Sequence, residues 1–448
     1  MAGKYPKTII ITTAQKGGEP FKEFIAGLET RAKQAKNSEI WIMPTNGKDK
    51  KAELSPYFQD KNKFKIMPRT YLLNSNVLLM QDLTIPAENV NPLLGIARHV
   101  PTGKTAILPA TKLMMKTYTD SKKEHRTLIA TGAVTRPDYS TSHKGQVARL
   151  DHHYSAVILE VEDDQRYHFR QLNADASGVF YDLGYRYERS KKPKFERLEA
   201  LVLGDWHEGD NPEEVIEATK AMIIEFQPKR IYIHDLFAGD EIDYWHKEDK
   251  AYQADKAKKG SSIKVTLHNC WKRLRWFEDI SPKDTKIKID KSNHDERLYN
   301  YLKEGTFLAD SINSKEGAML YSRMGEGVDP LIEGIKLFGG DIPKRVYFLQ
   351  RADTEEIHGW TLGVHGDRGP AGKKATTASM SENYDAIVAG HGHYDEIFRN
   401  VWRVGTSSEL NPEFTSGSPS NWMHSNLSMP SNWHPQLIRI IDGEYKAA

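Results

Sequence analysis

Five short apolar segments in the second half of the chain each run into aspartate, asparagine or histidine. In chain order, the residues that follow these segments are Asp205 and His207, Asp235, Asn293 and His294, His365, and His391 and His393. Short apolar runs bounded by turn residues are typical of buried β-strands. Helical patterns lie between them, such as NPEEVIEATKAMIIEF, in which Asn211 is predicted to cap the helix and Pro212 to take its first position. Strands that alternate with helices predict a sheet whose faces are covered by helices.

The polar residues at these strand ends have the chemistry of metal ligands. Open sheets of this kind gather ligands at the carboxyl ends of their strands. Carboxylate, amide and imidazole groups bind Mn²⁺, Fe²⁺ or Zn²⁺. Alone, a His-x-His pair such as His391 and His393 is more often a surface feature, and Asp205 alone is more often a turn or cap residue. Together, seven candidate ligands suit two ions that share one bridging carboxylate.

The order of these motifs resembles the calcineurin-like metallophosphoesterase superfamily. The resemblance covers about residues 201–408 and consists of D-x-H, an aspartate after the next strand, N-H-D, a single histidine and G-H-x-H. The run HDLF at 234–237 is similar to the G-D-L-F of the SbcD-type DNA exonuclease branch. The first 190 or so residues resemble no family that we can name.

The resemblance implies a role for each matching residue. His294 would stabilise the transition state or protonate the leaving oxygen, and Asp295 would orient it. The implied metal ligands are Asp205, His207 and His393 for the first ion, Asn293, His365 and His391 for the second, and Asp235 as the bridge.

Two positions depart from the family pattern. His234 and Ser292 stand where the family usually has glycine. His234 is either an outer partner of the site or a residue that faces the core. Asp240 is an alternative to Asp235 as the bridging residue, but we prefer Asp235 because it directly follows the strand RIYI.

The chain is predicted to be a mixed α/β protein with two parts. Hydrophobic residues make up 38% and charged residues 28%, as in folded globular proteins. Residues 198–448 are expected to form a metallophosphoesterase β-sandwich flanked by helices (αββα). Residues 1–190 contain strand and helix patterns of their own, including a hairpin at 153–172, and are expected to be an N-terminal α/β or α+β accessory region of unknown role. His152 and His153 have no partner motif nearby and are expected to be structural.

The implied activity is binuclear-metal-dependent phosphodiester hydrolysis, in which a metal-bridging hydroxide attacks phosphorus in line. The first hypothesis is a DNA nuclease, exo or endo, with two Mn²⁺ ions, and with Fe²⁺, Zn²⁺ or Mg²⁺ as alternatives. The second is a nucleotide phosphatase or small-molecule phosphodiesterase on the same fold. The third is a non-catalytic nucleic-acid-binding or scaffold protein.

A segment between the second and third motifs places cations beside aromatic rings. Such a mixture suits phosphate contacts and base stacking. An ordinary amphipathic helix, with tryptophan in the core and basic groups in water, explains it equally well. The candidate substrate-binding residues are Trp271, Lys272, Arg273, Arg275 and Trp276. A later Ser-, Asn- and Trp-rich stretch either lines the mouth of the site, with Trp422, His424 and Trp433, or forms an ordered loop over a sheet edge.

The remaining features concern location and partners. The single cysteine, Cys270, fits a reducing cytoplasm, and no apolar run reaches the roughly 18–20 residues of a membrane span. We therefore expect a cytoplasmic protein, in the bacterial host if it is phage-encoded, that does not engage a membrane. With a net charge of +2, DNA would have to be attracted by local patches. Homo-oligomers are an open alternative, and any ATPase partner would be a separate chain because the sequence lacks a Walker-type motif.

Overall fold

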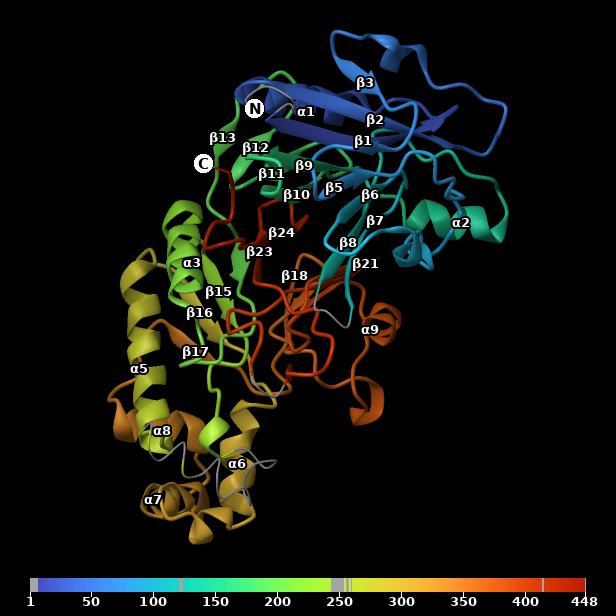
Figure 1. Ribbon diagram of the computed structural model, residues 1–448. Coiled ribbons are helices and arrows are strands. Elements are labelled where there is room, and N and C mark those ends of the chain that lie inside the picture. The colour runs from blue at the N-terminus through green and yellow to red at the C-terminus, as the bar shows by residue number, and fades with distance from the viewer. Residues whose placement is uncertain are drawn as a thin grey trace.

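The computed structural model describes residues 7–120, 124–242, 254, 258, 260–412 and 415–447. Four sheets, of five, three, six and ten strands, organise these residues. The two larger sheets carry the second half of the chain, and the five-stranded sheet belongs to the first half (Figure 1).

The six-stranded sheet holds the first three of the five predicted strands. From edge to edge, its strands are β17 (Val346–Phe348), β16 (Lys286–Ile289), β15 (Arg230–Ile233), β14 (Ala200–Val202), β23 (Ser425–Met429) and β24 (Gln436–Arg439). Strands β14 to β17 run parallel, and β23 is antiparallel to β14. The carboxyl ends of the parallel strands therefore open at one edge of the sheet.

The ten-stranded sheet holds the other two predicted strands. Its order is β18 (Glu355–Ile357), β19 (Trp360–Leu362), β20 (Ile387–Ala389), β22 (Val401–Arg403), β21 (Glu396–Phe398), β7 (Leu113–Thr119), β8 (His125–Thr131), β6 (Thr105–Leu108), β5 (Val77–Leu79) and β4 (Tyr71–Leu72). Strands β19 and β20 are parallel neighbours, so they too end side by side.

Helices cover the outer faces of both large sheets. The helices on the six-stranded sheet's side are α3 (Glu213–Phe226), α5 (Ile263–Ile280), α6 (Asp295–Lys303), α7 (Ser314–Gly325) and α8 (Pro330–Phe338). In β14, Leu201 packs with these helices, whereas Ala200 and Val202 pack with residues of the ten-stranded sheet such as Val388 and Trp402. This is the two-sided alternation of a central strand. Helix α9 (Thr377–Asn383) packs on the far face of β20 and β22. The predicted fold class, sheets packed between helices in a mixed α/β chain, is confirmed.

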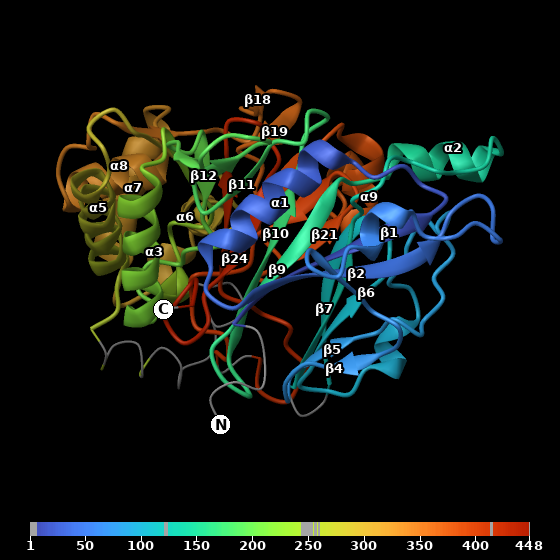
Figure 2. The same cartoon turned by 90° about the horizontal axis from the view of Figure 1, so that it is seen from above.

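The first half of the chain builds the five-stranded sheet. Its order is β10 (Tyr167–Asn173), β9 (Ser155–Val161), β1 (Thr8–Lys16), β2 (Ser38–Asn46) and β3 (Phe64–Ile66). Helix α1 (Lys22–Gln34) covers one face, as Figure 2 shows. The predicted hairpin is β9–β10, and Asp163 closes its turn by accepting hydrogen bonds from the N–H groups of Gln165 and Arg166.

The first half also contains shorter strands and a second α-helix. The three-stranded sheet consists of β11 (Phe180–Asp182), β12 (Tyr185–Tyr187) and β13 (Lys194–Phe195), and the helix is α2 (His143–Leu150). Strand β13 lies in the basic stretch between the two predicted parts.

The ten-stranded sheet runs across the predicted domain boundary. Strand β7, from the first half, pairs with β21, from the second, and Met115 stands opposite Ile397. The division into 1–190 and 198–448 stays a prediction, and the two ranges share this sheet.

The start of α3 differs from the sequence pattern. Asn211 was the expected cap, but α3 begins after Pro212, with no side-chain cap. The Asn211 amide instead donates to the carbonyl oxygens of Trp206 and Ser407, and so joins two loops beside the strand ends. Within the described ranges, no helix combines the length and apolar character that a membrane span requires.

Candidate metal centre

The seven predicted ligands come together at the strand ends. Asp205 and His207 follow β14, Asp235 follows β15, and Asn293 lies between β16 and α6. His365 follows β19, and His391 and His393 follow β20. The two sheets face each other, so these ends meet at one place although they are almost 190 residues apart in sequence.

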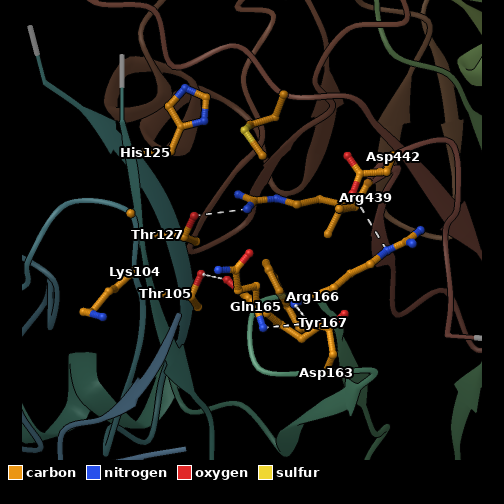
Figure 3. A pocket seen from close by; sticks show the side chains of 14 residues that line it. Lys104, Thr105, His125, Thr127, Asp163, Gln165, Arg166, Tyr167, Arg439 and Asp442 are labelled. Atoms are coloured by element: carbon orange, nitrogen blue, oxygen red, sulfur yellow. Dashed lines mark hydrogen bonds and ion pairs between the residues drawn. The ribbon is translucent and has the colours of Figure 1, made fainter. Parts of the chain in front are cut away.

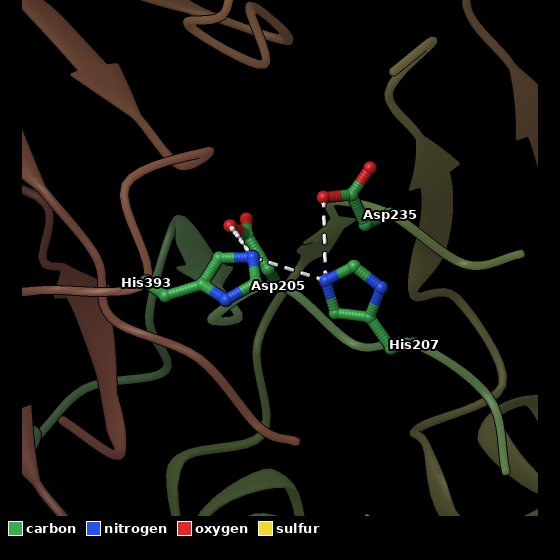
Figure 4. A group of neighbouring side chains, drawn as sticks. All are labelled: Asp205, His207, Asp235 and His393. Carbon is green, nitrogen blue, oxygen red and sulfur yellow. Dashed lines mark hydrogen bonds and ion pairs between the residues drawn. The ribbon is translucent and has the colours of Figure 1, made fainter. Parts of the chain in front are cut away.

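Four of the side chains form one half of the cluster, shown in Figure 4. Nε2 of His393 lies 3.1 Å from Nε2 of His207 and 3.3 Å from Oδ2 of Asp205. Nε2 of His207 lies 3.5 Å from Oδ2 of Asp235. One donor atom from each of the four residues lies within 4.8 Å of the others.

The remaining residues form the other half around His365. Nε2 of His365 lies 2.9 Å from Oδ1 of Asn293 and 3.3 Å from Nδ1 of His391. The same nitrogen is 3.3 Å from Oδ2 of Asp235. A single carboxylate oxygen, Oδ2 of Asp235, thus faces both halves, while His391 and His393 lie in different halves.

The backbone is bent to aim these side chains. His207, Asp235, His391 and His393 have φ values of 51°, 49°, 67° and 56°, in the left-handed region that non-glycine residues rarely occupy. Such conformations cost energy and persist where the surrounding structure enforces them, often at functional sites. Here, the N–H of His207 donates to the carbonyl of Asp235 at 2.7 Å, which fixes the two loops together.

Gly390 makes room for the cluster. A Cβ atom at this position would lie 2.3 Å from Oδ1 of Asp205 and 3.0 Å from the ring of His234. The same Oδ1 accepts a hydrogen bond from the N–H of His391 at 3.1 Å. The glycine before the first histidine of G-H-x-H is therefore required by close approach to Asp205.

Burial favours the uncharged form of every ionisable group in the cluster. It raises the pKa of Asp205 to about 8, and it raises the pKa of Asp235 well above its ordinary value, with the neighbouring Asp205 as the second cause. It lowers the pKa values of His207, His365 and His393 well below the usual range. Neutral imidazole is the form that binds a metal ion.

The cluster passes a simple test of fit for divalent cations. Oδ2 of Asp205 and Oδ1 of Asp235 are buried and have no hydrogen-bond partner. Leaving a buried carboxylate oxygen unpaired is costly unless a cation or donor satisfies it. The donor set, of imidazoles, carboxylates and one amide, suits Mn²⁺, Fe²⁺ or Zn²⁺.

His294 lies beside the first half, and its partners differ from those predicted. Its ring packs edge-on to His207 with centroids 4.3 Å apart. Its Nδ1 donates to the carbonyl of Ala238 at 2.8 Å, and its Nε2 accepts from Arg297 at 3.0 Å. His294 is therefore neutral in this arrangement, and burial lowers its pKa well below the usual value. The protonated form expected from the sequence requires Arg297 to release Nε2.

Asp295 does not orient His294. Its carboxylate accepts the backbone N–H groups of Ser292 and Phe237, at 3.1 and 3.4 Å. It is buried at the start of α6 and fixes the loop that carries Asn293. The orienting role belongs to the Ala238 carbonyl, which is available because the loop after β15 folds back over α6.

The two residues with alternative roles, His234 and Asp240, pair with residues outside the predicted ligand set. Nδ1 of His234 lies 3.1 Å from Oδ2 of Asp290, and both side chains are buried. A donor atom of His234 also lies within 4.8 Å of donors on Asp205 and His365. His234 is assigned an outer position here because its Nδ1 is directed at Asp290 and because Nε2 of His365 lies 3.3 Å from Oδ2 of Asp235. Asp240 pairs with Arg297 at 3.2 Å.

Most of the candidate substrate-binding residues on α5 are committed to the protein. Trp271 donates to the Asp341 carbonyl, and Trp276 packs with Trp206 and Phe277. Nε of Arg273 lies 2.7 Å from Glu208, which directly follows the ligand His207. Lys272 and Arg275 are exposed. The interpretation as an amphipathic helix therefore accounts for the tryptophans and Arg273, and leaves two cations on the surface.

The Ser-, Asn- and Trp-rich stretch contributes one ring to the site. The ring of Trp422 packs edge-on against His393, with centroids 4.0 Å apart. His424 bonds to the Ser408 carbonyl, and Trp433 stacks on His358 away from the ligands. His152 and His153 bond to the carbonyls of Thr135 and Asp151, in line with a structural role.

A separate cavity of about 520 Å³ adjoins this stretch through Met423 (Figure 3). Its polar groups bond to one another: Tyr167 donates to Thr105 at 2.6 Å, and Arg439 donates to Thr127 at 3.0 Å. The cavity contains none of the predicted ligands.

Sequence reasoning missed Arg297 and the role of Gly390. Arg297 lies three residues after His294, a spacing that places two side chains on one face of a helix. That spacing was the available signal, because the helix start at Asp295 could be recognised from the acidic residues after Asn293. The requirement for Gly390 depends on contact with the remote Asp205 and left no local signal.

Comparisons with known proteins give one distant relative. No family model matches the chain. Protein A1 of Escherichia phage T5 is 24% identical over 485 aligned residues, which cover 99% of this chain and 84% of that protein. Among solved structures, Vps29 of Chaetomium thermophilum, alone and with a cyclic peptide, is 13% identical and covers 39% of this chain with a TM-score of 0.24. A structural likeness of that size carries no argument about fold or activity.

Proposed function

We propose that this protein is a phosphodiester hydrolase that depends on two divalent metal ions, with Mn²⁺ as the first candidate and DNA as the substrate. The observation that carries the proposal is the position of Oδ2 of Asp235, at 3.5 Å from His207 and 3.3 Å from His365. One carboxylate oxygen between two sets of donors is the arrangement that a bridged pair of ions requires.

The residues divide between the two ions as follows. Asp205, His207 and His393 would hold the first ion, Asn293, His365 and His391 the second, and Asp235 both. When bound, the ions supply positive charge for the phosphate oxygens and lower the pKa of a nearby water molecule. The left-handed backbone at four of these residues holds the side chains in place before substrate arrives, which reduces the reorganisation needed during the reaction.

His294 and Arg297 would act on the substrate itself. In the present arrangement Arg297 occupies Nε2 of His294. A phosphate oxygen is a stronger acceptor for a guanidinium than a neutral imidazole nitrogen. Substrate would therefore draw Arg297 to the phosphate and release Nε2 of His294. The freed Nε2 would take up a proton from solvent and then pass that proton to the leaving oxygen.

DNA is proposed because two cations on α5, on either side of Arg273 in the sequence, are exposed to solvent. Lys272 and Arg275 lie on α5, whose Arg273 is anchored to Glu208 next to the ligand His207. Contacts of such cations with phosphates give sequence-independent, salt-dependent binding. Because its relative is a phage protein, we propose that the protein acts in a bacterial host. Its proposed partners are a separate ATPase chain or a second copy of the chain.

The proposal is tested with a Mn²⁺-supplemented panel of linear, circular and single-stranded DNA, RNA, nucleotides and a chromogenic diester. We expect hydrolysis of DNA and of the diester, and a loss of about 10²–10⁴-fold in kcat for His294→Ala, the usual contribution of a positioned acid or base. Bound metal, measured by elemental analysis, should stay at the wild-type level in this variant. Fast cleavage of nucleotides with slow cleavage of DNA would favour the phosphatase alternative.

Two isosteric variants test whether Asp235 or Asp240 is the bridging ligand. Asp235→Asn should lose bound metal after dialysis, whereas Asp240→Asn should retain it, because Asp240 pairs with Arg297. Equal metal content in the two variants contradicts the assignment of the bridge.

A further inference from the structure

Four aromatic rings form a continuous row through the first half of the metal centre. Ring centroids are 4.3 Å apart from His294 to His207, 4.9 Å from His207 to His393, and 4.0 Å from His393 to Trp422. Arg297 bonds to the His294 end of the row. The indole of Trp422 stands at the other end, next to a ligand but without a donor atom that could bind an ion.

The backbone holds Trp422 firmly in this position. The N–H of Met423 donates to the carbonyl of His393 at 2.9 Å, and the N–H of Thr406 donates to the carbonyl of Met423 at 2.9 Å. A Cβ at Gly405 would lie 1.9 Å from that same Met423 oxygen, so the two segments approach as closely as a glycine allows. Thr406 in turn forms a bridge with Asp205. The segment is thus fastened to both flanks of the centre.

The side chain of Trp422 is only partly buried. Trp433, in the same stretch, is 8% exposed and is packed as a core residue. Trp422 differs from it, because part of its indole remains accessible beside a metal ligand. A fixed, partly exposed ring offers contact area to a ligand at little cost in conformational entropy.

We propose that Trp422 is the stacking platform for the nucleobase next to the scissile phosphate, an inference that rests on the proposed phosphodiesterase activity. A nucleotide joins a phosphate to a flat aromatic base through one sugar. The row of rings can contact both parts of such a molecule. Arg297 and the ions would bind the phosphate, and the indole of Trp422 would stack on the base. Base stacking on an aromatic side chain is tolerant of sequence, so the subsite selects nucleotide esters as a class without reading their order.

The test compares two diesters with the same leaving group. Thymidine 5′-(p-nitrophenyl phosphate) carries a base, and methyl p-nitrophenyl phosphate does not. Trp422→Ala should lower kcat/KM for the thymidine ester by about 5- to 100-fold, the range of one stacking contact, and should change kcat/KM for the methyl ester by less than about twofold. Trp422→Phe, which keeps a ring, should recover much of the loss. An oligothymidylate substrate should lose activity with Trp422→Ala if the base belongs to a nucleic acid chain, and keep it if only free nucleotide esters are bound.

Two outcomes overturn the inference. An equal loss on both esters means that Trp422 only supports His393, and no loss on either means that it does not touch substrate. If the wild type hydrolyses neither ester, the proposed activity fails, and equilibrium dialysis with Mn²⁺ then decides the subsite. Weaker binding of thymidine 5′-monophosphate but not of methyl phosphate to Trp422→Ala still supports stacking, whereas equal binding to both proteins overturns it.

Discussion

At the residue scale, the centre depends on backbone that only certain residues allow. His207, His391, His393 and Asp235 occupy left-handed conformations because the loops around them are tied by hydrogen bonds to neighbouring strand ends. Gly390 provides the space into which Asp205 reaches. The ligand types could be predicted from the sequence because each follows an apolar run. The contacts of Asp295 and Arg297 could not, since they depend on how the loop after β15 folds over α6.

Gly390→Ala tests the importance of this space. The added methyl group would meet Oδ1 of Asp205 at 2.3 Å, so the carboxylate must move. We expect Mn²⁺ affinity to fall by about 10- to 100-fold, as when groups that orient ligands are removed, with the far-ultraviolet circular dichroism unchanged. Isothermal titration calorimetry measures the affinity.

Gly325→Ala is the matched control. It places the same methyl group at the end of α7, where nothing lies within 4 Å. The Mn²⁺ affinity of Gly325→Ala should equal that of the wild type. A similar affinity for both variants would show that Asp205 can shift without loss of the site.

At the element scale, local sequence patterns predicted the individual strands but not how the strands pair. The hairpin β9–β10 and the five strands before the ligands could be predicted because period-two or continuous apolar runs specify a strand from its own residues. The pairing of β7 with β21 joins Met115 to Ile397 across the whole chain, and no local pattern contains that information. Asn211 illustrates the same limit, because tertiary contacts with Trp206 and Ser407 replaced its expected capping role.

A buried ion cluster fastens β10, β11 and α1 together. Arg170 bonds to Glu160 at 2.8 Å and to Asp182 at 2.9 Å, and Nε of Arg31 lies 2.6 Å from Asp182. Gln436 of β24 also donates to Asp182, so the cluster reaches the six-stranded sheet. Burial by itself would raise the pKa of Asp182, but the two guanidinium groups outweigh it and hold that pKa well below its ordinary value.

Asp182→Asn should therefore lower the free energy of unfolding by about 3–5 kcal/mol at pH 7, because it leaves buried guanidinium charge uncompensated. The folded pKa lies below the unfolded pKa of about 3.9. The stabilisation is thus complete above about pH 4 and is lost progressively as the pH falls from there toward the folded pKa. Urea unfolding at pH 7 and pH 3.5 should show a large difference between wild type and variant at pH 7 and a smaller one at pH 3.5.

Asp284→Asn is the control for charge alone. Asp284 makes a two-point ion pair with Arg197 at 2.9 Å, but at the surface. Its removal should leave the urea midpoint nearly unchanged at both pH values. If Asp182→Asn behaves like Asp284→Asn, the buried cluster does not contribute to stability.

At the scale of the whole molecule, the sheet that supports His365, His391 and His393 is built from both halves of the chain. Strands β19 and β20 carry these ligands, and the same sheet continues through β21 into β7, β8 and β6. Ile397 and Trp402 share a core with Ile9, Met115 and Ile129 from the first half. The region that resembles a known superfamily therefore relies on residues outside that region for one flank of its core.

Residues 198–448 produced alone are therefore expected to fold poorly. Without β7, the edge of β21 would expose unpaired backbone groups, and unpaired edges promote aggregation. The apolar side chains of the shared core would also lose their cover. We expect this fragment to be largely insoluble, or to bind a hydrophobic dye and unfold without a cooperative transition in a thermal scan.

Coexpression with residues 1–197 should restore solubility, Mn²⁺ binding and cooperative unfolding, because β7 can then pair with β21 in trans. The full-length protein is the reference for each measurement. A fragment 198–448 that is soluble, unfolds cooperatively and binds Mn²⁺ as tightly as the full chain would establish it as an autonomous domain. In that case the first half is an accessory to a metal centre that is complete without it. If the fragment fails alone and is rescued in trans, the first half is a structural part of the centre.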